Sequence, residues 1–281
     1  MLDLLRTAKR GQALGALPDY LMYRTPLAKA WAKMKGHDFQ KSALIWFHDD
    51  GRVHTRLTLL LPRLALEFPK LTHIDMKLEF YTQDGRLERE HCFEKLSISK
   101  PFALDSRRLP KEFNLPTPFN GSLLVKQKIS APGKRPLFRS THTYIDYYSE
   151  GSFITTLHDY CAFLPDQGIN EASLGMIPAY ANDSTETFLI IHSAKAGIRS
   201  EDLKVFLYNA EGEEKCAPLP ALRPFSVQKV FVRELFPEAD AFLKSGPGQI
   251  VVKGIFRMLL RRIAYGVENK KLGTFSLDHC Y

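Results

Sequence analysis

The two halves of the sequence repeat each other, and this repeat restricts the chain to folds that can be built twice. When the first half is displaced by 127 positions, Lys77 falls on Lys204 and Gly85 falls on Gly212. The same register matches Tyr81 with Tyr208, Gly121 with Gly248, Lys126 with Lys253, and Leu124-Val125 with Val251-Val252. Glycine recurs at turns because it adopts positive φ at little cost. The equal spacing of 36 residues from Gly85 to Gly121 and from Gly212 to Gly248 therefore predicts the same turns in both halves.

The repeat extends to the end of each half after one gap. Five residues near Ala131-Pro132-Gly133 must be skipped to bring Gly151-Ser152-Phe153 onto Gly273-Thr274-Phe275. The last strands then carry Leu157-His158-Asp159-Tyr160-Cys161 and Leu277-Asp278-His279-Cys280-Tyr281. We match the opening strands through the histidines that close them, His48 and His192. This match leaves 17 extra residues in the first copy, since 29 positions separate His48 from Lys77 and 12 separate His192 from Lys204.

Short apolar or alternating runs bounded by turn residues predict β-strands through both halves. The clearest is Ile74–Tyr81, which alternates strictly and ends at the hairpin signal Gln83-Asp84-Gly85. The other runs are Ala43–Phe47, Leu123–Lys126, Phe138–Tyr148, Phe188–Ile191, Lys204–Tyr208, Ile250–Lys253 and Ile263–Val267. Few helical windows separate them, so we expect an all-β protein of tandem duplicated antiparallel β-sandwich domains with a short N-terminal helical arm.

The predicted division is a helical arm at 1–41, a first sandwich at 42–166, a linker at 167–182 and a second sandwich at 183–281. The arm contains eight basic and three acidic side chains, which accounts for +5 of the formal net charge of +8. Apolar residues at helical spacing, interrupted by glycines and prolines, predict short amphipathic helices there. Such an arm can bind an anionic membrane surface or an acidic partner, or its apolar face can pack on the chain's own sheets.

Composition excludes several classes of protein. A content of 44% hydrophobic and 25% charged residues in 281 excludes a fully disordered chain. No run of eighteen apolar residues could span a membrane, and the first residues make a poor signal peptide. The four cysteines are widely spaced and form no CxxC motif, so we expect mostly buried free thiols and a cytoplasmic protein, with the arm leaving a peripheral position at the inner membrane face open. A pI of about 9.2 without a recognisable nucleic-acid module disfavours nucleic acid as a partner.

The second half resembles a known family. It has an apolar strand ending in a polar residue, a hairpin Lys-Val-Phe-Leu-Tyr-Asn-Ala-Glu-Gly, a proline-rich stretch from Pro218 to Pro224, a Val-Gln-Lys-Val-Phe-Val strand and an Ile-Val-Val strand. This order, over residues 186–267, is similar to the small β-sandwich of the sensory rhodopsin transducer family. The resemblance implies a soluble, oligomeric, non-catalytic sandwich of carbohydrate-binding type. No site residue of that family can be carried over, and the tandem copy and the basic arm depart from it.

A binding face is predicted on the strand Thr141–Tyr148. Alternation places His142, Tyr144, Asp146 and Tyr148 on one face, where they could stack against a sugar ring and bind its hydroxyl groups. The alternative is a tyrosine-rich strand that packs against the arm or the other sandwich. The hairpins of both copies also carry basic residues at equivalent places, which could bind phosphate, an anionic glycan or lipid headgroups or could simply be solvated. These are Lys134, Arg135 and Arg139 in the first copy and Arg257, Arg261 and Arg262 in the second.

Residues that could carry catalysis gather at the final strands. His158-Asp159 and Asp278-His279 each have a cysteine and a tyrosine beside them. A zinc site would need four converging ligands, and adjacent strand residues such as His279 and Cys280 point to opposite faces, so we predict no metal and no cofactor. The chain also has no Gly-x-Ser-x-Gly elbow, no glycine-rich phosphate loop and no His-Glu-x-x-His motif.

The sequence therefore predicts a non-catalytic binding protein that recognises an anionic or carbohydrate-bearing partner, with a membrane surface as one setting. The candidate ligand-binding residues are His142, Tyr144, Asp146, Tyr148, His158, His279, Arg139, Arg261 and Arg262. Two alternatives stay open. One is a hydrolase or metal-dependent enzyme that uses His142, His158, Asp159 and His279, and the other is a scaffold whose sandwiches form homo-oligomers.

Overall fold

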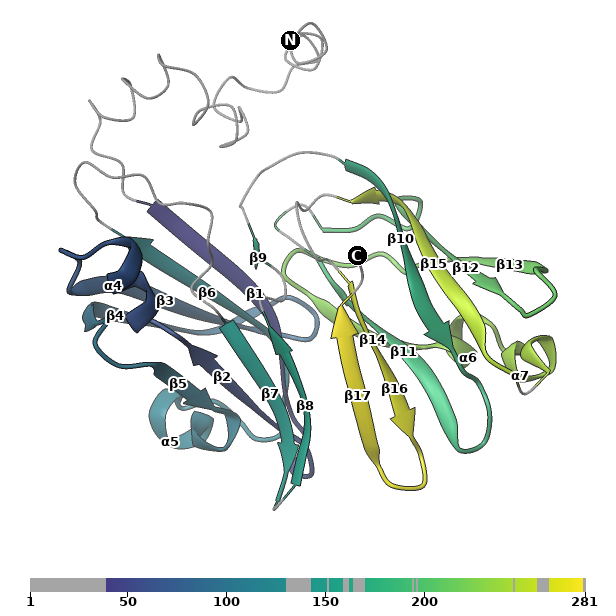
Figure 1. The fold of residues 1–281 in the computed structure, drawn as a ribbon, viewed down its shortest axis with the longest axis horizontal. Coiled ribbons are helices and arrows are strands. Elements are labelled where there is room, and N and C mark those ends of the chain that lie inside the picture. The colour runs from purple at the N-terminus through teal and green to yellow at the C-terminus, as the bar shows by residue number, and fades with distance from the viewer. Residues whose placement is uncertain are drawn as a thin grey trace, which may run out of the picture.

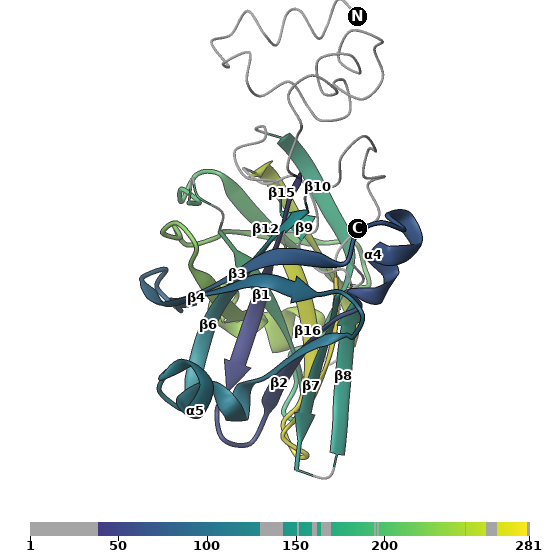
Figure 2. The same cartoon turned by 90° about the vertical axis from the view of Figure 1, so that its left-hand side faces the viewer.

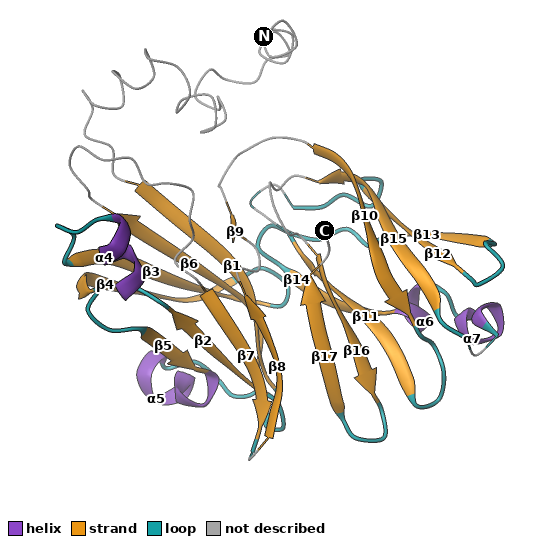
Figure 3. Ribbon diagram, in the orientation of Figure 1, coloured by secondary structure: helices purple, strands orange, loops and turns teal. Residues whose placement is uncertain are grey.

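The computed structural model describes residues 39–129, 143–150, 152–158, 162–163, 170–193, 195, 197–244, 246–256 and 263–279. These residues form four antiparallel sheets with a few short helices, so the all-β prediction is confirmed (Figure 1, Figure 3). The predicted N-terminal arm lies outside the described residues up to position 38. The strand β1 begins at Phe39, three residues inside the predicted arm.

The sheets are named here I to IV. Sheet I consists, in order, of β4 (Leu87–Ser97), β3 (His73–Thr82), β6 (Phe119–Ile129), β1 (Phe39–Asp49) and β9 (Ala162–Phe163). Sheet II consists of β5 (Phe102–Asp105), β2 (His54–Leu59), β7 (Thr143–Ser149) and β8 (Ser152–His158). Sheet III consists of β14 (Val227–Phe231), β11 (Thr185–His192), β16 (Ile263–Asn269) and β17 (Thr274–His279). Sheet IV consists of β10 (Asn170–Ala179), β15 (Gly248–Phe256), β12 (Leu203–Tyr208) and β13 (Glu214–Pro218).

The two halves have the same topology. The order β4-β3-β6-β1 of sheet I is repeated by β13-β12-β15-β10 in sheet IV, and β5-β2-β7-β8 of sheet II by β14-β11-β16-β17 in sheet III. Short helices follow the fifth strand in both copies, namely η2 (Ser106–Arg108) and α5 (Leu109–Phe113) in the first and α6 (Val232–Leu235) and α7 (Ala239–Leu243) in the second. Among the described residues, only the first copy has a helix after its second strand, namely α4 (Pro62–Glu67). The chain is therefore a duplicated sandwich.

Equivalent glycines carry out the same tasks in both copies. Gly85 and Gly212 have φ of +85° and +81°, as their hairpin turns require. A side chain on Gly121 would meet the carbonyl oxygen of Tyr81 at 2.0 Å, and one on Gly248 would meet that of Tyr208 at 2.4 Å. The glycines of the repeat thus mark two turns and two close backbone contacts.

The matching of the opening strands by His48 and His192 is wrong. The partner of β1 is β10, because Phe47 lies opposite Gly121 and Ala179 opposite Gly248. The partner of β11 is β2. A buried threonine confirms this register, because the hydroxyl of Thr55 accepts the backbone N–H of His48 and the hydroxyl of Thr187 accepts the backbone N–H of Tyr180. Histidine is not required by either backbone position, so its recurrence carried no structural information.

The predicted linker at 167–182 is also wrong over most of its length, since residues Asn170–Ala179 form β10. Gly175 and Pro178 made this stretch resemble a loop. Because β10 is the edge strand of sheet IV, a proline is tolerated where its missing N–H would face away from the sheet. The register also shifts between Leu174 and Ile177, as at a β-bulge.

Each copy has its own apolar core between its two sheets. Phe47, Phe80, Leu57 and Ile145 are fully buried between sheets I and II. In the second copy, one face of sheet III contributes residues such as Leu189 and Ile191 to a core shared with sheet IV and the helices α6 and α7. Alternation along the strands places these side chains inward.

The opposite face of sheet III packs against the first copy (Figure 1, Figure 2). Phe188, Ile190 and Phe275 belong to the same apolar cluster as the core of sheets I and II. The ring of Phe275 lies 6.1 Å from that of Trp46 and 5.9 Å from that of Tyr147. The two sandwiches therefore share buried apolar surface instead of being joined only by a linker.

The β3–β4 hairpin extends this contact to the loop before β14. The backbone N–H of Val227 donates to the carbonyl of Gln83 at 3.1 Å, and the ring of Phe225 stacks on Tyr81 at 4.6 Å. A side chain on Gly85 would meet the carbonyl oxygen of Pro224 at 2.1 Å. This turn therefore needs glycine both for its conformation and for the close approach of the second copy.

Two further expectations concern cysteines and membranes. Cys92 and Cys216 are exposed free thiols on β4 and β13, so the prediction of buried thiols is wrong for them, because both face outward from edge strands. Cys161 and Cys280 lie outside the described residues. Within the described ranges, none of the helices has the length and hydrophobicity needed to cross a bilayer.

Candidate functional site

The outer faces of the equivalent sheets II and III have opposite character. In sheet III this face holds Phe188 and Ile190, and it is buried against the first copy. Arg56 on β2 lies opposite Asp146 on β7, and Phe188 on β11 lies opposite Gly266 on the equivalent strand β16. Arg56 therefore occupies the position in sheet II that Phe188 occupies in sheet III. In sheet II the same face is polar, and the side chain of Arg56 on it is half exposed. The face of sheet II is therefore the place where a ligand could bind without separating the two copies.

Arg56 and Asp146 form the centre of this face. Two nitrogens of the guanidinium, Nη2 and Nε, donate to Oδ2 of Asp146 at 2.9 and 3.1 Å. The hydroxyl of Thr156 donates to the other carboxylate oxygen at 2.6 Å. These contacts fix both charged groups, although the side chain of Arg56 remains 51% exposed. A fixed fork of donors beside a fixed carboxylate can bind a ligand with little loss of conformational entropy.

A second pair lies next to the first at the end of β5. Arg107 donates to both carboxylate oxygens of Asp105 at 3.1 Å, and the hydroxyl of Tyr148 donates to Oδ2 of Asp105 at 2.5 Å. Burial opposes the charge of Asp105, but the hydrogen bonds from Arg107 and Tyr148 outweigh it and keep its pKa below the usual value. Burial and the same carboxylate raise the pKa of Tyr148, so the phenol stays a hydrogen-bond donor at all physiological pH values.

The ring of Tyr148 lies against both arginines. The guanidinium carbons of Arg107 and Arg56 are 5.1 and 5.7 Å from the ring centre, at the distance of cation–π contacts. The ring of His54 is 5.5 Å away. Tyr148 therefore joins the two arginine–aspartate pairs into one row, and stacking on a ligand falls instead to Tyr144, which lies half-buried on the same face.

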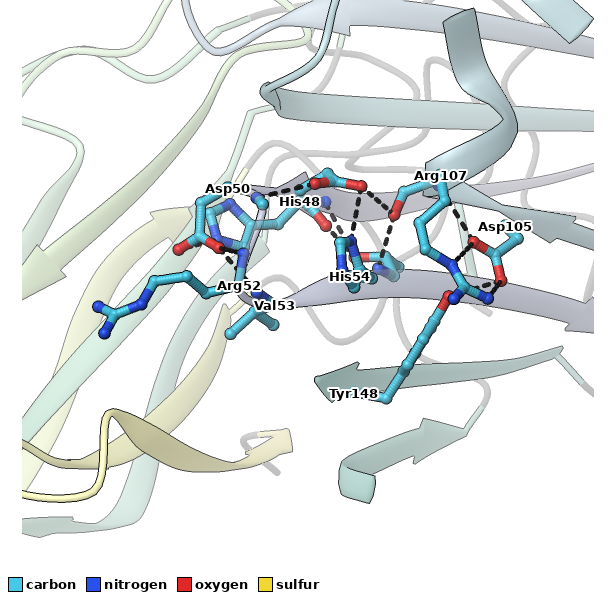
Figure 4. A network of polar contacts seen from close by, with 12 residues as sticks. His48, Asp50, Arg52, Val53, His54, Asp105, Arg107 and Tyr148 are labelled. Carbon is cyan, nitrogen blue, oxygen red and sulfur yellow. Dashed lines mark hydrogen bonds and ion pairs between the residues drawn. The ribbon is translucent and has the colours of Figure 1, made fainter. Parts of the chain in front are cut away.

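A buried cluster around His54 lies beside this row, between the β1–β2 turn with Asp50 and the group of Asp105, Arg107 and Tyr148 (Figure 4). The hydroxyl of Ser106 and Nδ1 of His54 both bind Oδ2 of Asp49, at 2.6 and 3.0 Å. Ser106 also accepts the backbone N–H of Thr55 at 3.0 Å. Aspartate, histidine and serine are the components of a hydrolase triad, but here the serine bonds to the aspartate instead of the histidine and is fully buried. The cluster therefore fixes the β1–β2 turn and the β5–η2 junction, and offers no nucleophile.

The β1–β2 turn places a second histidine beside this cluster. Nε2 of His48 lies 3.4 Å from the carboxylate of Asp50, and its ring stacks on Trp46 at 4.8 Å. Burial lowers the pKa of His48 in spite of this carboxylate. Burial opposes the charge of Asp50, but the backbone N–H groups of Val53 and Arg52 donate to it and lower its pKa. His48 is thus neutral at pH 7, and the charge of Lys229 from the second copy adds to the lowering of its pKa.

The structure brings three of the predicted ligand-binding residues together. Tyr144, Asp146 and Tyr148 share the outer face of β7, while Ile145 and Tyr147 face the core, as the alternation predicted. His158 and His279 are placed by their backbones, opposite Tyr144 in β8 and opposite Ala264 in β17. The remaining predicted residues lie outside the described ranges, namely His142, Arg139, Arg261 and Arg262.

Sequence reasoning missed Arg56, Asp105 and Arg107. A signal for Arg56 existed, because His54–Leu59 alternates and places Arg56 two residues from Thr58 on a polar face. Asp105 lies at the end of the short strand β5 and Arg107 in the 3-10 helix η2, and neither element is long enough to show an alternating pattern in the sequence. No three His, Cys, Asp or Glu side chains in the described ranges converge on a metal position.

Comparison with known proteins adds no assignment. No protein-family model matches this chain, and no curated protein matches it. The resemblance to the sensory rhodopsin transducer family stays a prediction.

Proposed function

We propose that this chain is a non-catalytic binding protein that recognises a carbohydrate-bearing partner with the outer face of sheet II. One observation carries the proposal. The face is equivalent to the apolar face with which sheet III binds the first copy, yet it presents a fixed row of donors and acceptors, Asp146–Arg56–Tyr148–Asp105–Arg107. Sugar hydroxyls donate and accept hydrogen bonds, so a row in which the two alternate is complementary to a polyol.

The charge of the row favours a neutral or weakly charged sugar. Two guanidinium groups are balanced by two carboxylates, and each pair is within 3.1 Å. A strongly anionic ligand would have to compete with Asp105 and Asp146, whereas a hydroxyl group can bridge each pair without breaking it. The half-buried ring of Tyr144 supplies an apolar surface on the same face for a sugar ring.

A glycan array probed with the intact protein tests this function, and Arg56→Ala and Arg107→Ala identify the surface. Loss of one charge-assisted hydrogen-bond donor weakens binding by about tenfold. We expect that loss in both variants and unchanged binding in Arg199→Ala, which removes a similarly exposed arginine (68%) from the second copy. Circular dichroism checks that all variants fold. An intact protein that binds no glycan, or equal binding by all the variants, would refute the proposal.

A further inference from the structure

A pair of lysines recurs at equivalent positions on the outer faces of sheets I and IV. Lys77 on β3 lies directly opposite Lys126 on β6, and Lys204 on β12 lies directly opposite Lys253 on β15. Like charges that face each other across two strands repel, so each pair calls for a counter-ion. The described residues supply such a counter-ion in the first copy but not in the second.

In the first copy two glutamates neutralise the pair, since Glu90 on β4 lies 2.7 Å from Nζ of Lys77 and Glu79 contacts both lysines. Oε1 of Glu79 lies 2.6 Å from Nζ of Lys126 and 3.1 Å from Nζ of Lys77. Oε2 accepts the hydroxyl of Tyr81 at 2.7 Å. Burial opposes the charge of Glu79, but the hydrogen bonds from Lys126, Tyr81 and Lys77 outweigh it, and the pKa of Glu79 lies below its usual value. Two lysines and a tyrosine thus form a carboxylate-binding triad.

In the second copy the triad is repeated without either glutamate, and Cys216 stands where the first copy has Glu90. Lys204, Lys253 and Tyr208 take the places of Lys77, Lys126 and Tyr81, while Phe206 stands where the first copy has Glu79. Nζ of Lys253 lies 3.4 Å from the hydroxyl of Tyr208 and 4.4 Å from the ring centre of Phe206. Both lysines are exposed, and no carboxylate in the described part of the chain lies within ion-pair distance of either.

We propose that Lys204, Lys253 and Tyr208 bind the carboxylate of a small acidic ligand. The first copy shows that these three groups, on this backbone, can hold a carboxylate by both of its oxygens. The ring of Phe206 and the 38% exposed side chain of Ile255 add an apolar surface on the same face of sheet IV, which suits a carboxylate attached to a planar or apolar body. The site lies on the second copy and is independent of the sugar-binding face of sheet II.

Titration of the intact protein with sodium benzoate tests the site, with the lysine side-chain carbons followed by NMR at constant ionic strength. We expect saturable shifts at Lys204 and Lys253 and none at Lys77 and Lys126, where Glu79 already occupies the triad. Sodium acetate should bind more weakly, because it lacks the planar body. Inorganic phosphate that binds more tightly than benzoate would overturn the assignment to a carboxylate.

A variant that copies the first half into the second gives the sharper test. Phe206→Glu should supply an internal carboxylate to Lys204, Lys253 and Tyr208, and so weaken acetate binding by at least about tenfold relative to Phe206→Gln. The glutamine variant has the same shape without the charge and controls for loss of the ring. Equal binding by the two variants, or benzoate shifts of equal size at all four lysines, would refute the proposal.

Discussion

The interface between the two copies gives a prediction whose size follows from the structure. The side chain of Phe275 is 7% exposed, and its ring centre lies 5.7 Å from Phe188, 5.9 Å from Tyr147 and 6.1 Å from Trp46. Two of these neighbours belong to the first copy. Replacing a buried phenylalanine by alanine removes the transfer free energy of the ring and leaves a cavity, which together cost about 3–5 kcal/mol. We expect Phe275→Ala to lower the free energy of unfolding by that amount.

The assay is urea denaturation of the intact protein, followed by tryptophan fluorescence and by far-ultraviolet circular dichroism. Trp46 is 2% exposed at this interface, and its emission reports on the contact when Trp31 is replaced by phenylalanine in the wild-type background and in every variant. Because one apolar cluster contains residues of both copies, the wild type should unfold in a single transition that both probes report alike. Leu272→Ala, at a position that is 72% exposed, is the matched control and should change the free energy by less than about 0.5 kcal/mol.

Two results would refute this reasoning. A loss below about 1 kcal/mol in Phe275→Ala would mean that the ring contributes little more than a surface residue. Two separate transitions in the wild type, with only one of them affected by the substitution, would mean that the copies fold independently and that the contact between them is incidental.

Two further predictions concern a close backbone contact and a buried histidine. Gly121→Ala should destabilise the fold by about 1–3 kcal/mol, because its Cβ would lie 2.0 Å from the carbonyl oxygen of Tyr81. The control is Gly175→Ala, whose Cβ would have its nearest neighbour at 3.8 Å and which should have little effect on the urea midpoint. Equal effects of the two substitutions would contradict the role of Gly121. Burial lowers the pKa of His192 to about 3 from 6.5, so the unfolded chain binds a proton that the folded chain does not, and the stability present above pH 6.5 is lost as the pH falls from there towards 3. His192→Leu should lose less stability than the wild type between pH 7 and pH 5, measured by urea midpoints, and the same loss in both would count against this origin.

The sequence predicted those features of the fold that backbone geometry requires. Gly85 and Gly212 recur because their turns need positive φ, and Gly121 and Gly248 recur because a carbonyl oxygen lies where a side chain would stand. Their spacing therefore revealed the duplication. His48 and His192 have no such constraint, and their use in matching the opening strands led to the wrong register.

The sequence pattern could not predict features that depend on how strands pair and how sheets pack. The strand β10 was mistaken for a linker because the edge of a sheet tolerates Pro178. Alternation along β7 correctly placed Tyr144, Asp146 and Tyr148 on one face, but alternation does not show whether another sheet covers that face. Asp105 and Arg107 join the row only because β5 pairs with β2, which no local periodicity indicates.

The outer faces of the equivalent sheets II and III differ in polarity, and this difference has a consequence for what each face can bind. In the contact between the copies, the outer face of sheet III packs against Trp46 of sheet I, and β17 lies beside its equivalent strand β8 of sheet II. Sheet II is the counterpart of sheet III. If its outer face carried apolar side chains like Phe188 and Ile190, sheet II would offer the same contact to another chain. Arg56 and Thr58 stand at those two positions instead. Docking this face on an apolar surface would bury the ion pair of Arg56 and Asp146 at a cost of several kcal/mol, so Arg56 and Thr58 disfavour at sheet II the kind of contact that Phe188 and Ile190 make at sheet III.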